Sequence, residues 1–280
     1  MKKIITLSLM LTVTAAVLLL TSCQKEKVNN DSNTDPDNQQ YPSTAHVIRK
    51  AVTDIDGNTY DAVQIGNQVW MAENLRTTRY ADGTTIPLGT QGTVSPCRYA
   101  PGRGQNNEEN ATNVAHFGYL YNWAAVMHGD NSSLANPSGI QGICPSGWHV
   151  PSDAEWTELT DYVNSQSQYQ CDSNIVNIAK SLSSNTDWES SSSHCAVGND
   201  LTSNNSTDFS ALPAGGYFVG TPIEDDFRGY KQFGESAFFW SATLYDSSNP
   251  IYRGLSYINA NVAKSSYYAS GGFSVRCIRN

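Results

Sequence analysis

The chain has 280 residues, of which 26 are acidic and 17 are Lys or Arg, so its formal net charge at pH 7 is −9. No basic stripe runs along it, which argues against nucleic acid as a partner. The length is enough for one large domain or two small ones, and the lack of a second break in composition favours one.

The first 22 residues have the pattern of a secretory signal. Lys2 and Lys3 precede an almost uncharged apolar run, Ile4 to Leu20, which is short for a membrane-spanning helix. The following Thr21-Ser22-Cys23 resembles the lipobox of bacterial lipoproteins, in which the Cys is acylated and becomes the mature N-terminus. We therefore expect residues 1–22 to be a lipoprotein signal peptide and Cys23 to be the lipidation site. The alternative is an ordinary signal peptide with an incidental Cys.

Residues 23–45 are expected to be a disordered tether, because they are polar and contain few large apolar side chains. Loss of the signal peptide changes the formal net charge from −9 to −11, since it removes Lys2 and Lys3. The start Cys23-Gln24-Lys25-Glu26-Lys27 resembles signals that send lipoproteins of some gut-type Gram-negative bacteria to the outer face of the outer membrane. We expect a surface-displayed, lipid-anchored protein with residues 46–280 as its folded domain.

Cysteine usage agrees with export, where disulfides persist. The six cysteines are Cys23, Cys97, Cys144, Cys171, Cys195 and Cys277. Lipidation of Cys23 leaves five, and two bridges among five allow fifteen arrangements that the sequence alone does not distinguish. No C-x-x-C pair occurs, so zinc and thioredoxin-like chemistry have no support in the sequence.

A hairpin is predicted from Asn58 to Glu73, where two β-rich runs flank Gly66-Asn67. The preceding stretch, Asp54-Ile55-Asp56-Gly57-Asn58, is similar to the start of a calcium loop. Its Gly stands at position 4 instead of 6, and position 12 is Ile65, which excludes an EF-hand. We predict a β-turn that leads into the first strand of the hairpin.

Helical periodicity predicts two helices and a third, weaker one. In the first, from Phe117 to Met127, apolar residues recur at i, i+3, i+6, i+7 and i+10. The second begins at Ser152, which forms the S-x-x-E pattern of a capping box with Glu155. The weaker pattern runs through Ile175, Ile178, Ala179 and Leu182.

The last third of the chain reads as a long loop followed by strands. Residues 182–210 are rich in Ser, Asn and Asp, and a Cys171–Cys195 bridge is a candidate tie for this loop. The predicted strands are Gly216–Gly220, Ala237–Leu244, Gly254–Ala260 and Phe273–Ile278. Strands at both ends with helices between them predict an α+β fold with a mostly antiparallel sheet, two or three helices and long loops.

The stretch from Ile143 to Leu159, ICPSGWHVPSDAEWTEL, concentrates a Cys, a His, two Trp and several acids. Capping explains Ser152 and Glu155, and burial explains Trp156 and Leu159. Only His149 lacks a structural task, and we expect it to be hydrogen-bonded and non-catalytic.

Several stretches resemble, in the same order, the Fibrobacter succinogenes major paralogous domain. They are DIDGNTYDAVQIGNQVWMAENL (54–75), FGYLYNWAAV (117–126), CPSGWHVPSDAEWTEL (144–159), FWSAT (239–243) and GGFSVRCIRN (271–280). The resemblance covers about residues 48–280. WHVPSDAEW and GFSVR also resemble stretches of the formylglycine-generating-enzyme fold. Both resemblances imply a C-type-lectin-like α+β fold with paired N- and C-terminal strands. They also imply a bridge from the helix region to the last strand, which makes Cys144–Cys277 the preferred pair.

The chain departs from the catalytic and calcium-binding members of such folds. Tyr267–Phe273 lacks the C-terminal Cys pair of formylglycine-generating enzymes, and Trp240-Ser241-Ala242 replaces the W-N-D of calcium-dependent lectins. Neither E-P-N nor Q-P-D occurs, nor does a zincin, P-loop, nucleophile-elbow or Rossmann motif. Two interpretations fit the acidic stretch Glu224-Asp225-Asp226, a hard-cation site and a solvated loop. A glycosidase needs two carboxylates that face each other across a cleft, and the adjacency of Glu108 and Glu109 in sequence gives no evidence of that. We expect no catalytic residue, metal or cofactor.

Aromatic residues and polar loops favour a binding function, since they supply stacking surface and hydrogen bonds. The tyrosines expected to be exposed are Tyr80, Tyr99, Tyr217, Tyr230, Tyr252, Tyr267 and Tyr268. The loops 220–235 and 246–253 are the expected contact regions, with Tyr230, Tyr252, Asp225 and Asp226 as ligand-binding candidates. The expected function is a non-catalytic binding or adhesion module for glycan or protein ligands. The alternatives are a hydrolase of surface polysaccharide and a structural envelope component, and the oligomeric state stays open.

Overall fold

The predicted hairpin lies near the start of the described chain. The computed structural model describes residues 46–89, 93–102, 110–220 and 228–280. Strands β2 (Thr59–Ile65) and β3 (Gln68–Met71) pair antiparallel, with Ile65 opposite Gln68. Gly66 holds a φ of 60°, in the left-handed region that glycine adopts without a steric cost. The hairpin prediction is confirmed.

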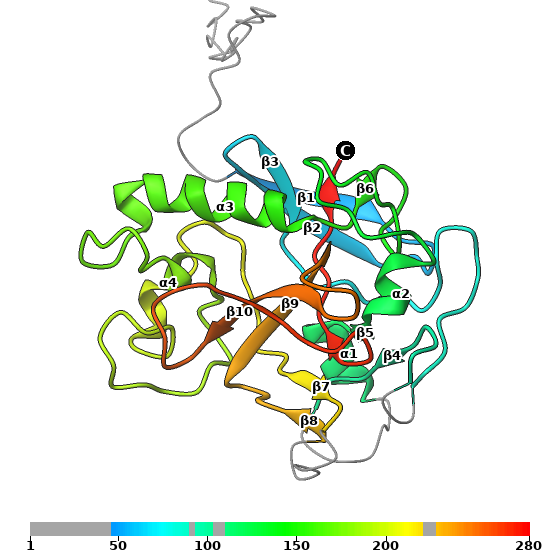
Figure 1. Cartoon of the computed structure of the whole chain (residues 1–280). Coiled ribbons are helices and arrows are strands. Elements are labelled where there is room, and N and C mark those ends of the chain that lie inside the picture. Colours follow the sequence, from blue (N-terminus) through cyan, green and yellow to red (C-terminus); the bar gives the residue numbers. More distant parts are fainter. Residues whose placement is uncertain (1–45, 90–92, 103–109, 221–227) are drawn as a thin grey trace, which may run out of the picture. The chain divides into compact units, whose positions relative to one another are not determined.

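The first sheet joins the two ends of the described chain. Its strand order is β1-β2-β3-β13-β6, and its other strands are β1 (His46–Thr53), β6 (Trp148–His149) and β13 (Ile278–Arg279). The last strand lies between β3 and β6, with Ile278 opposite both Trp70 and His149. In Figure 1 this strand is the red segment that ends at the C-terminus. N-terminal and C-terminal strands therefore pair.

Two further sheets complete the fold. The second has the order β11-β10-β9 and contains β9 (Ser236–Leu244), β10 (Pro250–Ser256) and β11 (Ala263–Ser266). The third has the order β4-β5-β12-β7-β8 and contains β4 (Arg98–Tyr99), β5 (Leu120–Asn122), β7 (Gly216–Phe218), β8 (Gly229–Lys231) and β12 (Gly272–Phe273). Each strand pairing within these sheets is antiparallel among the described residues.

Helix α3 (Asp153–Ser165) begins at the predicted capping box. The Ser152 hydroxyl accepts the Glu155 N–H at 3.2 Å, and the Glu155 carboxylate accepts the Ser152 N–H at 2.9 Å. The helix contacts β2, β9 and β10, and it crosses the upper part of the domain in Figure 1. Its buried Trp156 lies 4.6 Å from the Trp70 ring, between centroids, so the helix seals one face of the core.

The predicted helix from Phe117 to Met127 is wrong. The structure contains α1 (Ala111–Phe117), then strand β5, then α2 (Trp123–Met127). Gly118 ends α1 with a φ of 75°, and the Asn122 side chain caps α2 by accepting the N–H of Ala125. Pairing of β5 with β12 holds the intervening residues extended. The apolar spacing thus spans three elements.

The weaker helix is present only as α4 (Ala179–Leu182). Ile175 and Val176 are exposed. They lie in a turn that is closed by the N–H of Cys171, which donates to the carbonyl of Asn177. The neighbouring regions contain the short 3₁₀ helices η1 (Ser167–Tyr169) and η2 (Leu201–Ser203). The rest of residues 183–210 lacks helix and strand, as predicted.

All four later strands differ from their predicted bounds: β7 ends two residues early, β9 begins one residue early, and the other two differ more. β10 precedes the predicted Gly254–Ala260 by four residues at each end, because it pairs with the last part of β9 through Pro250 opposite Leu244. The predicted strand Phe273–Ile278 divides into β12 and β13. Between them Arg276 is fully buried and donates to carbonyls of other segments, so this backbone leaves one sheet and joins another.

Both cystine pairs named from the sequence are bonded in the structure. Cys144–Cys277 has an S–S length of 2.01 Å and links the segment before α3 to the residue before β13. Cys171–Cys195, at 2.02 Å, ties the long loop to the end of the α3 region. Cys97 is buried and forms no disulfide with another described cysteine.

The described residues belong to one compact unit with antiparallel sheets and few helices, which is an α+β architecture. Its hydrophobic core has three parts, of which the largest surrounds Trp240 and Phe273. The longest described helix has 13 residues, and none of the helices in the described ranges has the length and apolarity needed to cross a membrane.

Candidate binding site

Two hollows open on either side of one partition, which we define as the turn Asp54–Asn58 together with the segment Arg76–Arg79. The smaller hollow is about 210 Å³ and is lined by Thr53, Asp54, Ile55, Thr77, Arg79, Ala81, Ile143, Pro145 and Ser146. The larger is about 480 Å³ and is lined by Asp56, Asn58, Arg76, Thr78, Ala111, Val114, Ala115 and Tyr119. The partition contributes residues to both.

Side chains of the partition alternate between the two hollows. Arg76 and Thr78 line the larger hollow, whereas Thr77 and Arg79 line the smaller one. A short stretch of chain therefore determines the polar surface of both cavities.

Asp54 connects the two halves of the partition inside the protein. Its buried carboxylate accepts the backbone N–H groups of Asp56 at 3.0 Å and of Asn58 at 2.9 Å. It also accepts the Tyr60 hydroxyl at 2.5 Å, and that hydroxyl in turn accepts the N–H of Arg76 at 3.0 Å. Burial, and then Asp54, raise the pKa of Tyr60, so its phenol keeps the proton that it donates. The turn prediction is confirmed, with Gly57 N–H donating to the carbonyl of Asp54.

Asp56 makes the second connection, at the surface of the partition. Its carboxylate accepts the Thr78 N–H at 2.5 Å, the Thr78 hydroxyl at 2.9 Å and the Arg79 Nε–H at 2.6 Å. Partial burial opposes ionisation of Asp56, but these bonds outweigh it and lower its pKa below the ordinary value. Asp56 is therefore an anion that holds residues 76–79 against the turn.

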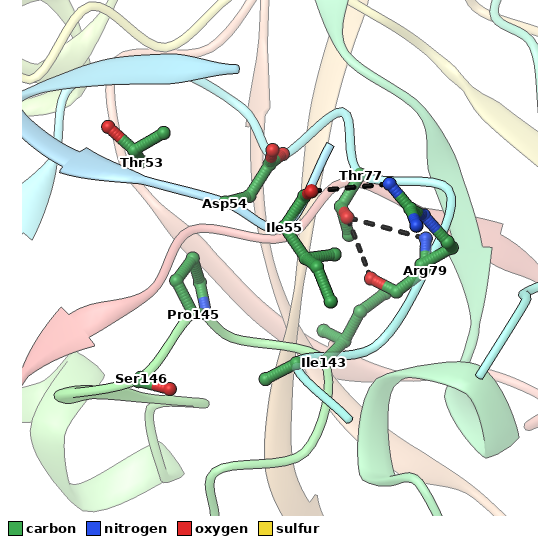
Figure 2. Close-up of a pocket in the computed structure, with 9 residues that line it drawn as sticks. Thr53, Asp54, Ile55, Thr77, Arg79, Ile143, Pro145 and Ser146 are labelled. Atoms are coloured by element: carbon green, nitrogen blue, oxygen red, sulfur yellow. Dashed lines mark hydrogen bonds between the residues drawn. The ribbon is translucent and has the colours of Figure 1, made fainter. Parts of the chain in front are cut away.

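The smaller hollow has a polar side and an apolar side. Figure 2 shows the Arg79 guanidinium donating to the Ile55 carbonyl, at 3.2 Å, and the Thr77 hydroxyl donating to the Arg79 carbonyl, at 2.7 Å. The Ile55 side chain extends toward Ile143, and Pro145 lies on the other side of the hollow in the same view. Ile55 is 40% exposed, so this apolar surface is open to solvent.

The larger hollow is lined by hydrogen-bonding groups of the partition and by apolar residues of one helix. Ala111, Val114 and Ala115 come from α1, whereas Asp56, Asn58, Arg76 and Thr78 come from the partition. Arg76 is fixed in place, because Nη1 lies 2.9 Å from a Glu73 carboxylate oxygen and Nη2 donates to the Thr59 carbonyl at 2.8 Å. Its guanidinium also lies 4.5 Å from the centroid of the Tyr60 ring.

The lining favours noncovalent contacts. Both carboxylate oxygens of Asp54 and of Asp56 already accept hydrogen bonds from the protein. The described lining residues include no histidine or cysteine. The lining presents amide, hydroxyl and guanidinium groups beside apolar surface. This is the usual composition of a small-molecule binding site.

The ligand-binding residues named from the sequence lie elsewhere. Tyr230, in β8, is half-buried with its ring 5.1 Å from that of Tyr217, and Tyr252, in β10, is half-buried 5.0 Å from the ring of Phe273. These two tyrosines belong to different sheets, and neither lines the smaller or the larger hollow. Asp225 and Asp226 lie outside the described residues, as does Glu224.

Three tyrosines expected to be exposed are buried, and for them the prediction is wrong. Tyr99 and Tyr217 stack on each other at 4.0 Å, and Tyr80 stacks on His128 at 3.6 Å. Ring stacking between different segments removes them from solvent, which a single segment of sequence does not reveal. Tyr268 is exposed, and Tyr267 is half-buried.

His149 has the structural task that the sequence did not assign. Its Nε2 lies 2.7 Å from a Glu155 carboxylate oxygen, and its Nδ1 lies 2.7 Å from the side-chain oxygen of Asn280. The two side chains of the His149–Glu155 pair are only 5% and 2% exposed. The pair therefore connects the start of α3 to the C-terminal residue inside the protein, away from both hollows.

Sequence reasoning missed the segment Arg76–Arg79 and the α1 face around Val114. The available signal was the Asp-Ile-Asp-Gly-Asn turn, whose two acids need donors from elsewhere in the chain once they are held in a fold. Those donors stand about twenty residues further on, in Arg-Thr-Thr-Arg.

Fold and site together define an α+β domain of antiparallel sheets with two hollows that share one partition. The family model described as Fibrobacter succinogenes major domain matches residues 63–279, and the chain belongs to this family. The match includes Arg76–Arg79 and α1, and it begins after the turn Asp54–Asn58. Comparison with curated proteins and with solved structures found no match.

Proposed function

We propose that the chain is a non-catalytic binding or adhesion module whose ligand is a glycan held in the larger hollow. The observation that carries this proposal is that Asn58, Arg76 and Thr78 line the same hollow as Val114 and Tyr119. A sugar ring has hydroxyl groups at its edge and C–H groups on its faces, so it complements a cavity with one polar and one apolar side.

Rigidity of the partition supports tight and selective binding. The Asp54 and Asp56 networks hold the turn and the segment 76–79 in one arrangement before any ligand arrives. Binding then costs little ordering of the protein, which is the general benefit of a preorganised site.

The state of the acids supports binding over hydrolysis of surface polysaccharide. A glycosidase needs two carboxyl groups that flank the scissile bond. Among the described residues that line the larger hollow, Asp56 is the one carboxylate, and three protein donors already occupy it.

We further propose that the α+β architecture is C-type-lectin-like. Two features support this finer assignment. Strands β3 and β13 pair the N- and C-terminal parts of the domain, and Cys144–Cys277 connects the segment before α3 to the last strand. Both are expected of that fold from the resemblance of the sequence motifs.

For the cellular location, we propose a lipoprotein of the outer membrane whose Cys23 carries the lipid and whose domain faces outward. Residues 1–22 act as the signal peptide and residues 23–45 as the tether. Labelled palmitate should be incorporated into the natural chain and not into Cys23→Ala. Protease added to intact cells should remove the domain, and complete protection would refute outward display.

The test of ligand class is a glycan array probed with the purified full-length chain, with and without calcium. Ala115→Trp should fill the larger hollow and weaken binding at least about tenfold. Thr112→Trp is the matched control, because Thr112 is exposed on the same helix but does not line the hollow. A large tryptophan at position 112 should leave binding unchanged.

Other outcomes favour other functions. Turnover of a bound glycan that disappears in Asp56→Asn would support the hydrolase. Blank glycan and protein arrays would support a structural envelope component. Equal binding by the two tryptophan variants would move the ligand site away from the larger hollow.

A further inference from the structure

A second group of reactive side chains surrounds the Cys171–Cys195 bridge. Asp172 and His194 flank the two cysteines in sequence, and the donor atoms of all four residues lie within 4.8 Å of one another. His194 Nε2 lies 2.8 Å from an Asp172 carboxylate oxygen, and that oxygen lies 3.5 Å from Cys195 Sγ. None of the four residues lines either hollow.

Backbone conformation explains why neighbouring side chains converge here. In an extended chain, adjacent side chains point to opposite faces. Asp172 and Cys195 instead have φ angles of 57° and 62°, in the left-handed region. In each adjacent pair, one residue has a backbone conformation that brings its side chain to the same side as its neighbour's. The carboxylate, the imidazole and the two sulfurs therefore lie close together.

We propose that this cluster is a redox-gated zinc site. In the oxidised chain the two sulfurs are bonded to each other and are not available as thiolate ligands. After reduction, two thiolates, the His194 imidazole and the Asp172 carboxylate form a set of four donors. Zn²⁺ takes four tetrahedral ligands of these types in proteins.

The reductant is a dithiol, either a small molecule or a protein. One of its thiolates attacks a sulfur of the cystine, the Cys171–Cys195 bond breaks, and one cysteine leaves as a thiolate. The second thiol of the reductant then attacks the reductant's sulfur in the mixed disulfide, which closes the reductant's own disulfide and releases the other cysteine as a thiolate. The dithiol is oxidised by two electrons, and the cystine becomes two thiols. Zn²⁺ then displaces one proton from each thiol without changing its own oxidation state.

Exposure makes this bridge the reactive one of the two. The side chains of His194 and Asp172 are 75% and 59% exposed. Cys195 is only 4% exposed, whereas Cys171 is half-buried and is the sulfur that an attacking thiolate can reach. Cys144 and Cys277 are both 0% exposed. Thiol exchange requires access for the attacking thiolate, so reduction is expected to open Cys171–Cys195 first.

Backbone hydrogen bonds fix the conformation of each half of the cluster after the sulfur bond breaks. The N–H of Cys171 donates to the Asn177 carbonyl at 2.9 Å, and the N–H of Ala196 donates to the Ser193 carbonyl at 3.1 Å. Each half of the cluster therefore keeps a local backbone hydrogen bond, and the metal replaces the covalent link between the halves.

The test uses the purified full-length chain, limited dithiothreitol and Co²⁺ as a spectroscopic probe for Zn²⁺. Peptide mapping after alkylation should show Cys171 and Cys195 modified while Cys144–Cys277 stays bonded. After anaerobic removal of the reductant, the chain should bind one Co²⁺ with a thiolate-to-metal charge-transfer band and tetrahedral visible bands, and Zn²⁺ should displace it. The oxidised chain should bind none.

Variants separate a built site from adventitious thiol binding. His194→Ala and Asp172→Asn should each weaken Co²⁺ affinity about tenfold or more. His116→Ala is the matched control, because His116 makes a similar exposed pair, 2.9 Å from Asp187, without sulfur nearby. Unchanged affinity in both ligand variants would overturn the proposal. So would earlier opening of Cys144–Cys277, or loss of the folded circular dichroism signal on reduction that Co²⁺ does not restore.

Discussion

The imidazole Nε2 of His149 lies 2.7 Å from the Glu155 carboxylate, where both side chains are almost fully buried. Its Nδ1 faces a second oxygen, from Asn280, so the charged imidazolium with two N–H donors fits the site best. Burial by itself lowers the pKa of a histidine, but the hydrogen bond and the charge of Glu155 outweigh it. The pKa of His149 is raised.

A raised histidine pKa makes stability depend on pH in a defined direction. The stabilisation from this pair is complete below the unfolded-state pKa of about 6.5, and it is lost as the pH rises through the folded-state pKa. His149→Leu should lower the free energy of unfolding by about 3–5 kcal/mol near pH 6, because it leaves Glu155 buried without its partner. The deficit should shrink at higher pH.

Urea unfolding between pH 5 and pH 9 measures this difference. His116→Leu serves as the control, since the His116–Asp187 pair is partly exposed and should contribute little. A deficit in His149→Leu that stays constant across the pH range would contradict the assignment of His149 as the titrating group.

The two disulfides should contribute unequally to stability. Cys144–Cys277 spans 133 residues and Cys171–Cys195 spans 24. A cross-link that closes a longer loop removes more conformational entropy from the unfolded chain, and these lengths correspond to a difference of about 1.5 kcal/mol. Double Cys→Ala variants of each pair, compared by urea unfolding, give the measurement. Equal losses would show that strain or residual unfolded structure dominates.

The capping box at α3 should also be measurable. Ser152→Ala removes the hydroxyl that accepts the Glu155 N–H, and the expected loss in the free energy of unfolding is about 0.5–2 kcal/mol. Ser165→Ala is the control at the other end of the same helix, where the serine is exposed and should contribute less than about 0.5 kcal/mol. A similar loss in both variants would contradict a specific N-terminal cap.

Arg276 holds the region between β12 and β13 together. Among the described residues no carboxylate pairs with it, and its guanidinium donates to Asn74 Oδ1 and to the carbonyls of Met71, Phe209 and Ser210. Burial lowers its pKa from the ordinary value. The charge is therefore stabilised by neutral acceptors that would be left unsatisfied without it.

Arg276→Met should lower the free energy of unfolding by about 3 kcal/mol or more, since several buried oxygens lose their donors at once. Arg276→Lys keeps the charge but lacks the planar fork of donors. Its free energy of unfolding should lie between that of the natural chain and that of Arg276→Met. Arg49→Met is the surface control, because the Arg49 side chain is 79% exposed. Thermal or urea unfolding of the three variants checks the order.

Local chemistry explains where the sequence predicted the structure well. Gly66 supplies the backbone conformation of the β2–β3 turn, and Ser152 and Glu155 cap α3 through atoms only three residues apart. Such interactions form between near neighbours, so they are visible in a short stretch of sequence.

Long-range pairing explains where prediction failed. The apolar spacing of residues 117–127 is helical, yet β5 is extended because Tyr121 and Asn122 pair with Phe273 and Gly272 of β12, about 150 residues away. The same reason applies to Tyr99 and Tyr217, which are buried against each other by strands far apart in the chain.

By itself, the sequence determined the family motifs, the α+β class, the turn at Asp54–Asn58 and the start of α3. Only the tertiary structure decided that Asp56 meets Arg79, that Asp172 meets His194, and that His149 is enclosed with Glu155. The physical reason is that hydrogen bonds, charges and cavities depend on distances between side chains. Chain order sets those distances only for near neighbours, and packing of the whole domain sets the rest.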